Sequence, residues 1–396
     1  MNTDIWDKQL DDFLIERKWI RRLCAGCGRT FYAKKRNEAK LCLRGQCSPN
    51  QGGFLNLSRR RIPLTIQSVA KCIESAFVAC GYKKLLAVNI TETFGNTDLI
   101  GAGVQILEPT LFGVKPVLMG ASLVFQPVAR MQYFGDCKEN DRGSTSFVNV
   151  CSEEASCSFG RHLEHIDTWL GILSHLGLFM GNVILLRRIS SENWGNGEFR
   201  QFELFVTYGD LELGDAVFGL VPTRTWGILP ISDIGFGLER LVWAINKFSS
   251  YFDPIRPLSF GLSFSRHTHD VLRTAALLTL CGIEASNEST GFQLRKVCKS
   301  AFEDLGGSSG EGDKVFLHYV NFWASFLAEN RTADEALGRF RKEMSRLAQT
   351  RLRETLKGPE VTSETIEAYA THLVYNLGVP IDEVKKALGA KYGKKG

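Results

Sequence analysis

Hydrophobic and polar positions follow two different periods along the chain, and each period predicts its own kind of element. Between residues 66 and 82, apolar residues recur at helical spacing and a glycine follows, which predicts a helix. Strand-like runs rich in β-branched and aromatic residues come next, at residues 85–91, 115–130, 144–151 and 182–190. A further pair, residues 199–208 and 211–221, is divided only by Gly209 and Asp210, and this spacing predicts an antiparallel hairpin.

Helical periodicity returns near residues 163–179 and dominates the chain from about residue 269 onward. Four helices are predicted there, at residues 269–282, 291–305, 313–330 and 333–354. Two short helices that end near Leu388 are predicted after them. Residues 306–314 are expected to form a loop, and residues 389–396 a frayed end. Because the strands come in runs and do not alternate with helices, the sequence predicts an α+β domain with an antiparallel sheet.

The composition is that of a globular protein with room for two or three domains. The 396 residues are 44% hydrophobic and 23% charged, and the net charge of +5 favours a polyanionic partner only weakly. No run approaches the roughly 18 apolar residues of a membrane span, and the N-terminal segment is too acidic and polar for a signal peptide. We therefore expect a cytoplasmic protein without a membrane partner.

Four of the 11 cysteines are grouped near the N-terminus with the spacing C-x2-C-x14-C-x4-C. An odd number of cysteines without an export signal indicates reduced thiols, and four thiolates form the tetrahedral shell that Zn²⁺ favours. So short a segment also has too little apolar surface to fold without such a metal. We therefore expect a structural zinc site, with four unrelated thiols as the alternative, at Cys24, Cys27, Cys42 and Cys47.

The sequence ISDIGFGLERLVWAINK, residues 231–247, resembles a dinucleotide-binding turn but has Arg240 where that fingerprint has its third glycine. If a strand ends at Gly237 and a helix follows, Arg240 lies near the helix N-terminus. Backbone N–H groups and a guanidinium together favour an anion such as phosphate at that place. A surface arginine paired with a neighbouring acid is the alternative.

Several segments, taken in order, make nearly the whole chain similar to the alanyl-tRNA synthetases of archaeal type, which are class II aminoacyl-tRNA synthetases. The specific ones are ISDIGFGLER, which resembles the third motif of the family, and ASNESTGFQLRK, which resembles its serine-asparagine-glutamate stretch. The other matching segments are the cysteine cluster, FQPVAR, SENWGNGEFRQFEL, LELGDAVF and YNLGVPIDEV. The resemblance implies a class II antiparallel sheet flanked by helices. It also implies a zinc-binding module (1–55), an adenylating catalytic domain (56–262) and a helical tRNA-recognition domain (263–396).

The resemblance assigns a nucleotide site. Arg130 falls where the second class II motif has the arginine that binds the α-phosphate of ATP, and Arg240 would bind the far end of the triphosphate. Phe147 would stack on the adenine. A carboxylate that attacks the α-phosphate brings two anions together, so these arginines and Mg²⁺ would stabilise the charge that builds up. Val148 stands where the family has a glutamate, which implies weaker or altered ATP binding.

An amino-acid pocket follows from the same resemblance. Asp233 and Gly235 would bind the amino acid, with the aspartate on its amino group. Trp194 and Val217 would wall a pocket for a small side chain, and ordinary core packing is an equal alternative for these two residues.

The departures from the family concern the substrate and the acceptor. The family's loop beside the pocket is replaced by GNGEFRQ, so Glu198 and Arg200 are expected close to the substrate. Asn287 matches an asparagine with which the family reads a G:U pair in the tRNA acceptor stem, but the second contact, an aspartate, falls at Tyr375. One good base contact is worth about 1–3 kcal/mol, so recognition of alanine tRNA is put in question.

The helical part offers one more feature, the basic run 338–354. It would suit phosphate contacts, with a solvated helix face as an equal alternative. The editing and C-terminal domains of the family are not matched, and a monomer is therefore expected.

Three functions remain open. The first is an editing-free synthetase-like ligase that activates a small amino acid, alanine or similar, as its adenylate and transfers it to tRNA. The second is a ligase that passes the same adenylate to a carrier protein or small molecule, which the tyrosine at position 375 favours. The third is a catalytically silent RNA-binding protein, which Val148 favours but the arginine and aspartate positions oppose.

Overall fold

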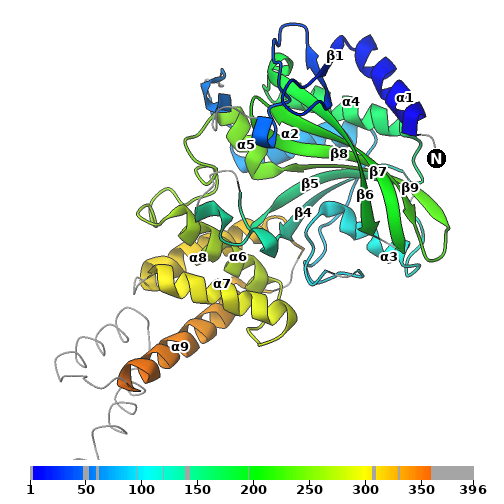
Figure 1. Ribbon diagram of the computed structural model, residues 1–396. Helices are drawn as coiled ribbons and strands as arrows, with labels where there is room; N and C mark the ends of the chain where they lie inside the picture. The colour runs from blue at the N-terminus through cyan, green and yellow to red at the C-terminus, as the bar shows by residue number, and fades with distance from the viewer. Residues whose placement is uncertain are drawn as a thin grey trace, which may run out of the picture. The chain divides into compact units, whose positions relative to one another are not determined.

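The structure is a computed structural model that forms two compact units (Figure 1). The first unit consists of Met1–Val88, Glu92–Val128 and Phe147–Ile255, and the second of Asn89–Thr91, Ala129–Ser146 and Arg256–Gly396. The structure describes residues 3–47, 53–58, 62–95, 97–118, 120–138, 143–194, 196–305, 309–328 and 331–357. None of the helices in these ranges has both the length and the apolar character needed to cross a membrane.

Across the described residues, the strands form a nine-stranded sheet in the order β1-β2-β6-β7-β8-β9-β5-β4-β3. The strands are β1 (Trp19–Leu23), β2 (Thr30–Lys34), β3 (Lys83–Lys84), β4 (Ser122–Ala129), β5 (Ser146–Ala155), β6 (Val183–Trp194), β7 (Gly197–Tyr208), β8 (Leu211–Pro222) and β9 (Ile228–Gly237). The ladders from β1 through β2 and β6 to β9 and β5 are antiparallel, and β3 pairs with β4 in parallel. Sequence-distant segments therefore become neighbours in the middle of the sheet, where β9 lies between β8 and β5.

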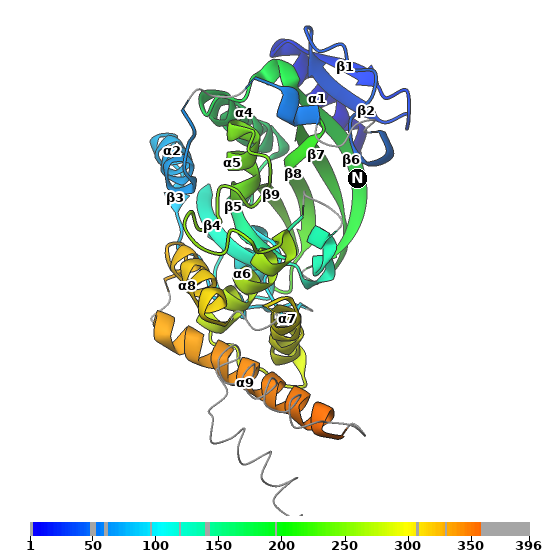
Figure 2. The ribbon, with the colours of Figure 1, turned by 90° about the vertical axis from the view of Figure 1, so that its left-hand side faces the viewer.

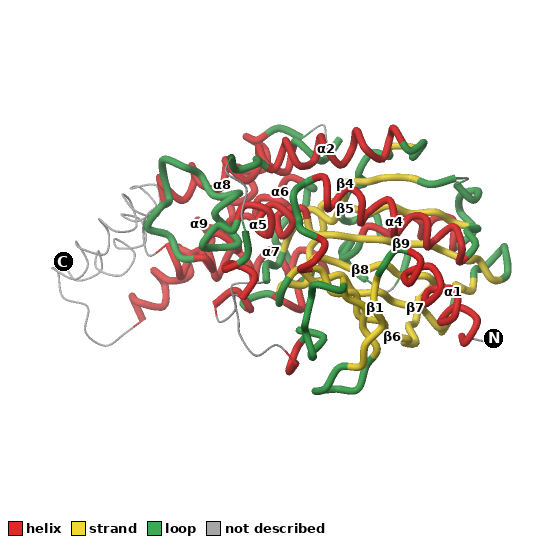
Figure 3. Tube along the Cα trace, turned by 90° about the horizontal axis from the view of Figure 1, so that it is seen from above, coloured by secondary structure: helices red, strands yellow, loops and turns green. Residues whose placement is uncertain are grey.

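Helices α2 (Ile66–Ala79), α4 (Phe159–His175) and α5 (Leu238–Asn246) cover one face of this sheet (Figure 2). Local side-chain caps mark two of these starts: Thr65 accepts from the Ser68 N–H (3.1 Å) before α2, and Ser158 accepts from the Arg161 N–H (3.1 Å) before α4. Helix α1 (Thr3–Glu16) packs on α4 and β1 (Figure 3), and Trp169 of α4 packs against Phe236 of β9. The short α3 (Glu108–Leu111) packs on the other face, against a cluster that includes Phe199 and Ile231.

The second unit is helical. It consists of α6 (Arg266–Leu280), α7 (Ser289–Leu305), α8 (Ser309–Ala324) and α9 (Ala333–Lys357). Helix α6 is buried on every side and contacts the other three. Two of its charged residues are fully buried. Asp270 accepts hydrogen bonds from the Thr145 N–H (2.8 Å) and hydroxyl (2.6 Å), and Arg273 donates to the Ser146 carbonyl (2.6 Å).

Most of the expected elements are confirmed. The α+β class, the largely antiparallel sheet and the 199–221 hairpin are present, with Tyr208 paired to Leu211 across the expected turn. The strand expected at residues 85–91 is wrong, because β3 ends at Lys84 and Ala87 forms only an isolated bridge. The Val88 N–H donates to the Gln126 side chain (3.0 Å), and the Thr91 N–H donates to the Asn89 side chain (3.1 Å). These two backbone groups are therefore hydrogen-bonded to side chains and not to a neighbouring strand.

The start of α8 differs from the sequence prediction. The loop expected at 306–314 is wrong from Ser309 onward, where α8 begins. The helices expected to end near Leu388, and Tyr375, lie outside the described residues. The three-part domain division stays a prediction, and β2 of the cysteine-rich segment pairs directly with β6, so this segment continues the sheet.

Candidate functional site

The site face of the sheet is the face that carries the odd-numbered side chains of β5, β8 and β9. Asp233 of β9 lies in its middle, directly paired with Glu153 of β5 on one side and with Val217 of β8 on the other. Gly235, two residues along, is paired with Cys151. Because strand side chains alternate between faces, all five positions belong to the site face. The structure thus brings together three of the residues predicted for the amino-acid pocket, Val217, Asp233 and Gly235.

Trp194 is held on the same face by a residue that the sequence analysis missed. Its Nε1 donates a hydrogen bond to Glu108 Oε1 at 3.0 Å, and its ring packs against the cluster that contains Ile231. Glu108 is 1% exposed and also accepts from the Phe94 N–H (2.9 Å) and from Gln105 Nε2 (3.2 Å). The carboxylate of α3 therefore fixes the orientation of the indole. Glu108 lies 86 positions from Trp194 in the sequence, so no local pattern connects them.

A strand ends and a helix begins at Gly237, as the sequence predicts. A methyl group at this glycine would lie 3.5 Å from Arg240 Cβ and 3.8 Å from the Phe147 ring, so both residues flank the junction. Arg240 Nη1 donates to the Glu212 carbonyl of β8 (3.1 Å). Two residues predicted for ATP therefore meet at one end of β9.

Val148 is buried, and its backbone N–H is hydrogen-bonded at the same junction. Its N–H lies 3.1 Å from both carboxylate oxygens of Glu239, which is itself fully buried in the first turn of α5. A carboxylate near the start of a helix is also favoured by the helix dipole. At the position where the resemblance expects a glutamate, the backbone of Val148 thus links β5 to α5 through a hydrogen bond to Glu239.

Glu198 and Arg200 lie on the opposite face, and the expectation that they approach the substrate beside Asp233 is wrong. They alternate with Phe199, which belongs to the site-face cluster, and they line a cavity of about 600 Å³ together with Trp6 and Phe218. The physical reason is the two-residue period of the strand, since residues adjacent in sequence point to opposite faces.

A further acidic group on the site face is Glu203 of β7, which the sequence pattern did not indicate. It is 3% exposed and binds the Arg188 guanidinium (2.8 Å to Nη2), the Ser190 hydroxyl (3.1 Å) and Gln201 Nε2. Such a buried carboxylate is stabilised by paired charge and several donors. Glu203 is the cross-strand partner of Val217, and the Arg188 guanidinium balances its negative charge.

The four clustered cysteines meet in space. Their sulfur atoms lie within 4.8 Å of one another, and the Cys27 and Cys42 sulfurs are 3.8 Å apart. A zinc ion about 2.3 Å from each of four tetrahedral sulfurs separates them by about 3.8 Å, so the donors fit this metal. Burial opposes ionisation of Cys24, but hydrogen bonds from the backbone of Cys42, Cys27 and Gly26 outweigh it and lower its pKa to about 6. Burial raises the pKa of Cys42 to about 12 and also raises that of Cys47, so the spacing of the four sulfurs is the feature that fits a cation.

The two remaining predicted residues belong to the second unit. Arg130 follows β4, is partly buried, and donates its backbone N–H to the Thr145 carbonyl (2.7 Å). Asn287 is exposed just before α7, and its side-chain oxygen accepts a hydrogen bond from Arg295.

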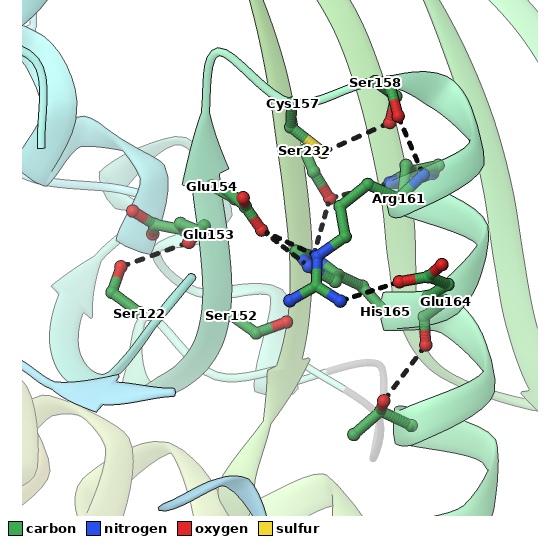
Figure 4. Close-up of polar contacts among 12 residues, drawn as sticks. Ser122, Ser152, Glu153, Glu154, Cys157, Ser158, Arg161, Glu164, His165 and Ser232 are labelled. Carbon is green, nitrogen blue, oxygen red and sulfur yellow. Dashed lines mark hydrogen bonds and ion pairs between the residues drawn. The ribbon is translucent and has the colours of Figure 1, made fainter. Parts of the chain in front are cut away.

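The helix-covered face of the sheet contains a buried polar network that no sequence pattern indicated (Figure 4). The Ser232 hydroxyl lies 2.8 Å from His162 Nδ1 and 3.3 Å from His165 Nδ1, and His165 Nε2 lies 2.9 Å from Glu154. Arg161 also binds Glu154 (3.2 Å). Burial lowers the pKa of His162 to about 3 and that of His165 to about 4, so both imidazoles are neutral at physiological pH.

Comparison with known proteins found no protein-family model that matches the chain. Three curated relatives are alanine–tRNA ligases, each 23% identical to this chain. The ligase of Archaeoglobus fulgidus matches over 326 residues, 76% of this chain and 35% of the relative. Those of Methanoregula boonei and Thermofilum pendens match over 319 and 266 residues, 74% and 62% of this chain and 34% and 29% of the relative. The chain thus spans about a third of the length of these relatives.

Two solved structures were also matched. A pyrrolysyl-tRNA synthetase of Desulfitobacterium hafniense is 16% identical, with a TM-score of 0.33 over 50% of this chain and 72% of that one. The asparaginyl-tRNA synthetase of Entamoeba histolytica with asparaginyl-adenylate is 12% identical, with a TM-score of 0.36 over 48% of this chain and 64% of that one.

Proposed function

We propose that this alanyl-tRNA synthetase-like chain is a ligase that activates a small amino acid with ATP and transfers it to tRNA. The observation that carries the proposal is the arrangement around β9. Asp233 lies beside Val217 in the middle of the site face, and Phe147 and Arg240 flank the end of the same strand. An amino-acid site and a nucleotide site can therefore share one strand.

In the first step, the carboxylate of the amino acid attacks the α-phosphorus of ATP, an acyl–phosphate bond forms, and pyrophosphate leaves. Phe147 stacks on the adenine and Arg240 binds the terminal phosphate. The α-phosphate role of Arg130, which belongs to the second unit, rests on its match to the second class II motif. Mg²⁺ bound to the ATP would supply further positive charge at the phosphates. Positioning and charge stabilisation account for most catalysis in phosphoryl chemistry of this kind.

The amino acid is selected by charge at one end and by size at the other. Asp233 receives the α-amino group, and Gly235, two residues along the same strand, belongs to the wall of the amino-acid site. Trp194, fixed by Glu108, and Val217 limit the side chain to a small apolar group. This arrangement supports alanine or an amino acid of similar size.

In the second step, a hydroxyl of the tRNA acceptor end attacks the activated carbonyl and AMP leaves. The exposed Asn287 and the basic helix α9 would contact the acceptor stem, mainly through phosphates. Zn²⁺ at Cys24, Cys27, Cys42 and Cys47 would have a structural role, because a closed four-thiolate shell has no open position for substrate.

The test is amino-acid-dependent exchange of labelled pyrophosphate into ATP, across all proteinogenic amino acids, with and without bulk tRNA. A small amino acid is expected to support exchange, and Arg240→Ala should lower the rate by about 100-fold or more. The matched control is Arg224→Ala, an exposed arginine in the β8–β9 turn, which should leave the rate unchanged.

Two outcomes would contradict the proposal. If no amino acid supports exchange although the folded protein binds ATP, amino-acid activation is not its function. If exchange occurs but the amino acid never appears on tRNA, the acceptor is a carrier protein or small molecule and the second step is wrong.

A further inference from the structure

Three metal-binding side chains converge on the site face outside the cysteine cluster. Cys151 and Glu153 come from β5 and Asp233 comes from β9, and one donor atom of each lies within 4.8 Å of the others. The register explains the convergence, because Glu153 pairs directly with Asp233 and Cys151 pairs with Gly235 next to it. The three donors therefore belong to two adjacent strands in the rigid centre of the sheet.

Glu153 is the unusual member of this group. Its side chain is 1% exposed, and neither carboxylate oxygen has a hydrogen-bond partner among the described residues. The next residue, Glu154, points to the opposite face, where Arg161 and His165 bind it, as Figure 4 shows. A buried carboxyl group without a hydrogen-bond partner is costly, and a bound cation would offset that cost.

Two glycines surround the group closely. A methyl group at Gly235 would lie 3.2 Å from the Cys151 sulfur, and one at Gly103 would lie 2.3 Å from this sulfur and 3.3 Å from Glu153 Oε1. Any larger residue at either position would therefore press on the donor atoms. Asp233 is partly buried, whereas Cys151 and Glu153 are buried, so Asp233 is the most accessible member of the group.

We infer that Cys151, Glu153 and Asp233 bind a divalent metal ion of the Zn²⁺ type, with one coordination position left open. A single thiolate with two carboxylates is a donor set that Zn²⁺ accepts, and three protein ligands with an open position are typical of catalytic zinc sites. The open position faces the substrate side. On the proposed function, its ligand is the α-amino group of the amino acid, and Asp233 then acts on the amine through the metal.

The donor types favour a metal ion over an ammonium group. Two carboxyl groups and one thiol place a donor atom each within 4.8 Å of the others. An ammonium group brings one charge and forms no coordinate bond to sulfur. A zinc ion brings two charges and binds carboxylate oxygen and thiolate sulfur alike.

The experiment is elemental analysis of zinc in the full chain after gel filtration. The wild type is expected to hold about one equivalent more than Cys151→Ser and about one more than Glu153→Gln, whatever the cysteine cluster contributes. The matched controls lose the same chemical groups elsewhere. Glu154→Gln removes the neighbouring carboxylate on the opposite face, Cys157→Ser removes another buried thiol, and both should keep the wild-type zinc content.

An unchanged zinc content in Cys151→Ser and Glu153→Gln, with melting curves that show a folded chain, would overturn the inference. If these variants do not fold, Asp233→Asn replaces them, because this partly buried residue tolerates an amide, and the same loss of one equivalent is expected. The metal count is independent of catalysis. A zinc difference without pyrophosphate exchange refutes the proposed function alone, and exchange without a zinc difference refutes the metal site alone.

Discussion

Glu153 and Asp233 are direct cross-strand partners on β5 and β9, and their carboxyl groups lie on the same face of the sheet. Like charges placed opposite each other in a sheet are destabilising, and burial makes the repulsion stronger. A pair of this kind is maintained where a cation or a shared proton separates the two groups. The relationship thus connects the stability of the sheet to the ligand that the site face binds.

Glu153→Gln should have opposite effects on stability with and without metal. In the presence of a chelator, the variant removes a buried acid beside Asp233, and the free energy of unfolding should rise by about 1–3 kcal/mol. In the presence of zinc, the variant loses a ligand and should be less stable than the wild type. Urea denaturation under both conditions measures the two differences, and the same sign in both would contradict this account.

Glu108→Ala should loosen the amino-acid pocket from a distance. The change leaves Trp194 Nε1, the Phe94 N–H and Gln105 Nε2 without an acceptor, at a cost of about 1–3 kcal/mol in stability. A freed indole should raise the KM for the amino acid by about tenfold and leave the KM for ATP unchanged. Glu108→Gln retains an acceptor oxygen and should restore most of both properties, and equal effects on the two KM values would argue against a positioning role for Glu108.

The buried histidines predict that acid destabilises the first unit. The folded-state pKa values of about 3 for His162 and about 4 for His165 lie below the unfolded value of about 6.5. Their contribution to stability is therefore complete above pH 6.5 and is lost as the pH falls toward 4. Each histidine adds a slope of up to about 1.4 kcal/mol per pH unit in this interval.

The groups that face these histidines are Ser232 for both, with Glu154, Arg161 and Glu164 around His165. Urea denaturation from pH 7.5 to 4.5 measures the slope. His162→Gln should flatten it, whereas the exposed His175→Gln should not. A wild-type slope identical to that of His162→Gln would show that His162 is not buried in its neutral form.

Removal of zinc from the cysteine cluster should destabilise the edge of the sheet. Cys24→Ser or a strong chelator should lower the melting temperature by several degrees, since a structural zinc site contributes folding free energy directly. Cys80→Ser changes an exposed cysteine of the same chain and should have no effect. Circular dichroism with parallel zinc analysis measures both quantities, and a chain that contains no zinc but melts normally would show that the four cysteines are unrelated thiols.

The sequence predicts those parts of the fold whose signals are local. The hairpin of β7 and β8 follows from alternation interrupted by Gly209 and Asp210, and the β9–α5 junction follows from a strand pattern that changes to helical spacing after Gly237. The sequence also predicts that the four clustered cysteines meet in space, because they lie close together along the chain.

What the sequence does not predict is which face each strand side chain occupies and which distant residues meet there. Glu153 and Glu154 are chemically alike, yet the carboxyl group of Glu153 is buried on the site face with no hydrogen-bond partner in the described part of the chain, and Glu154 binds Arg161 on the opposite face. Glu198 and Arg200 were misplaced for the same reason. The contact of Glu108 with Trp194 depends on how α3 packs on the sheet, which no spacing within either segment encodes.

Both outermost strands of the sheet are short and cationic. β1 contains Arg21 and Arg22, and β3 consists of Lys83 and Lys84. Positive charge on short edge strands hinders pairing with other chains, and such protection matters most for a broad open sheet. If zinc holds the hairpin of β1 and β2, as proposed, and the hairpin detaches on its removal, the 12-residue β6 becomes the new edge. Loss of one metal ion would then be seen first as aggregation, before any change in the chemistry on the site face.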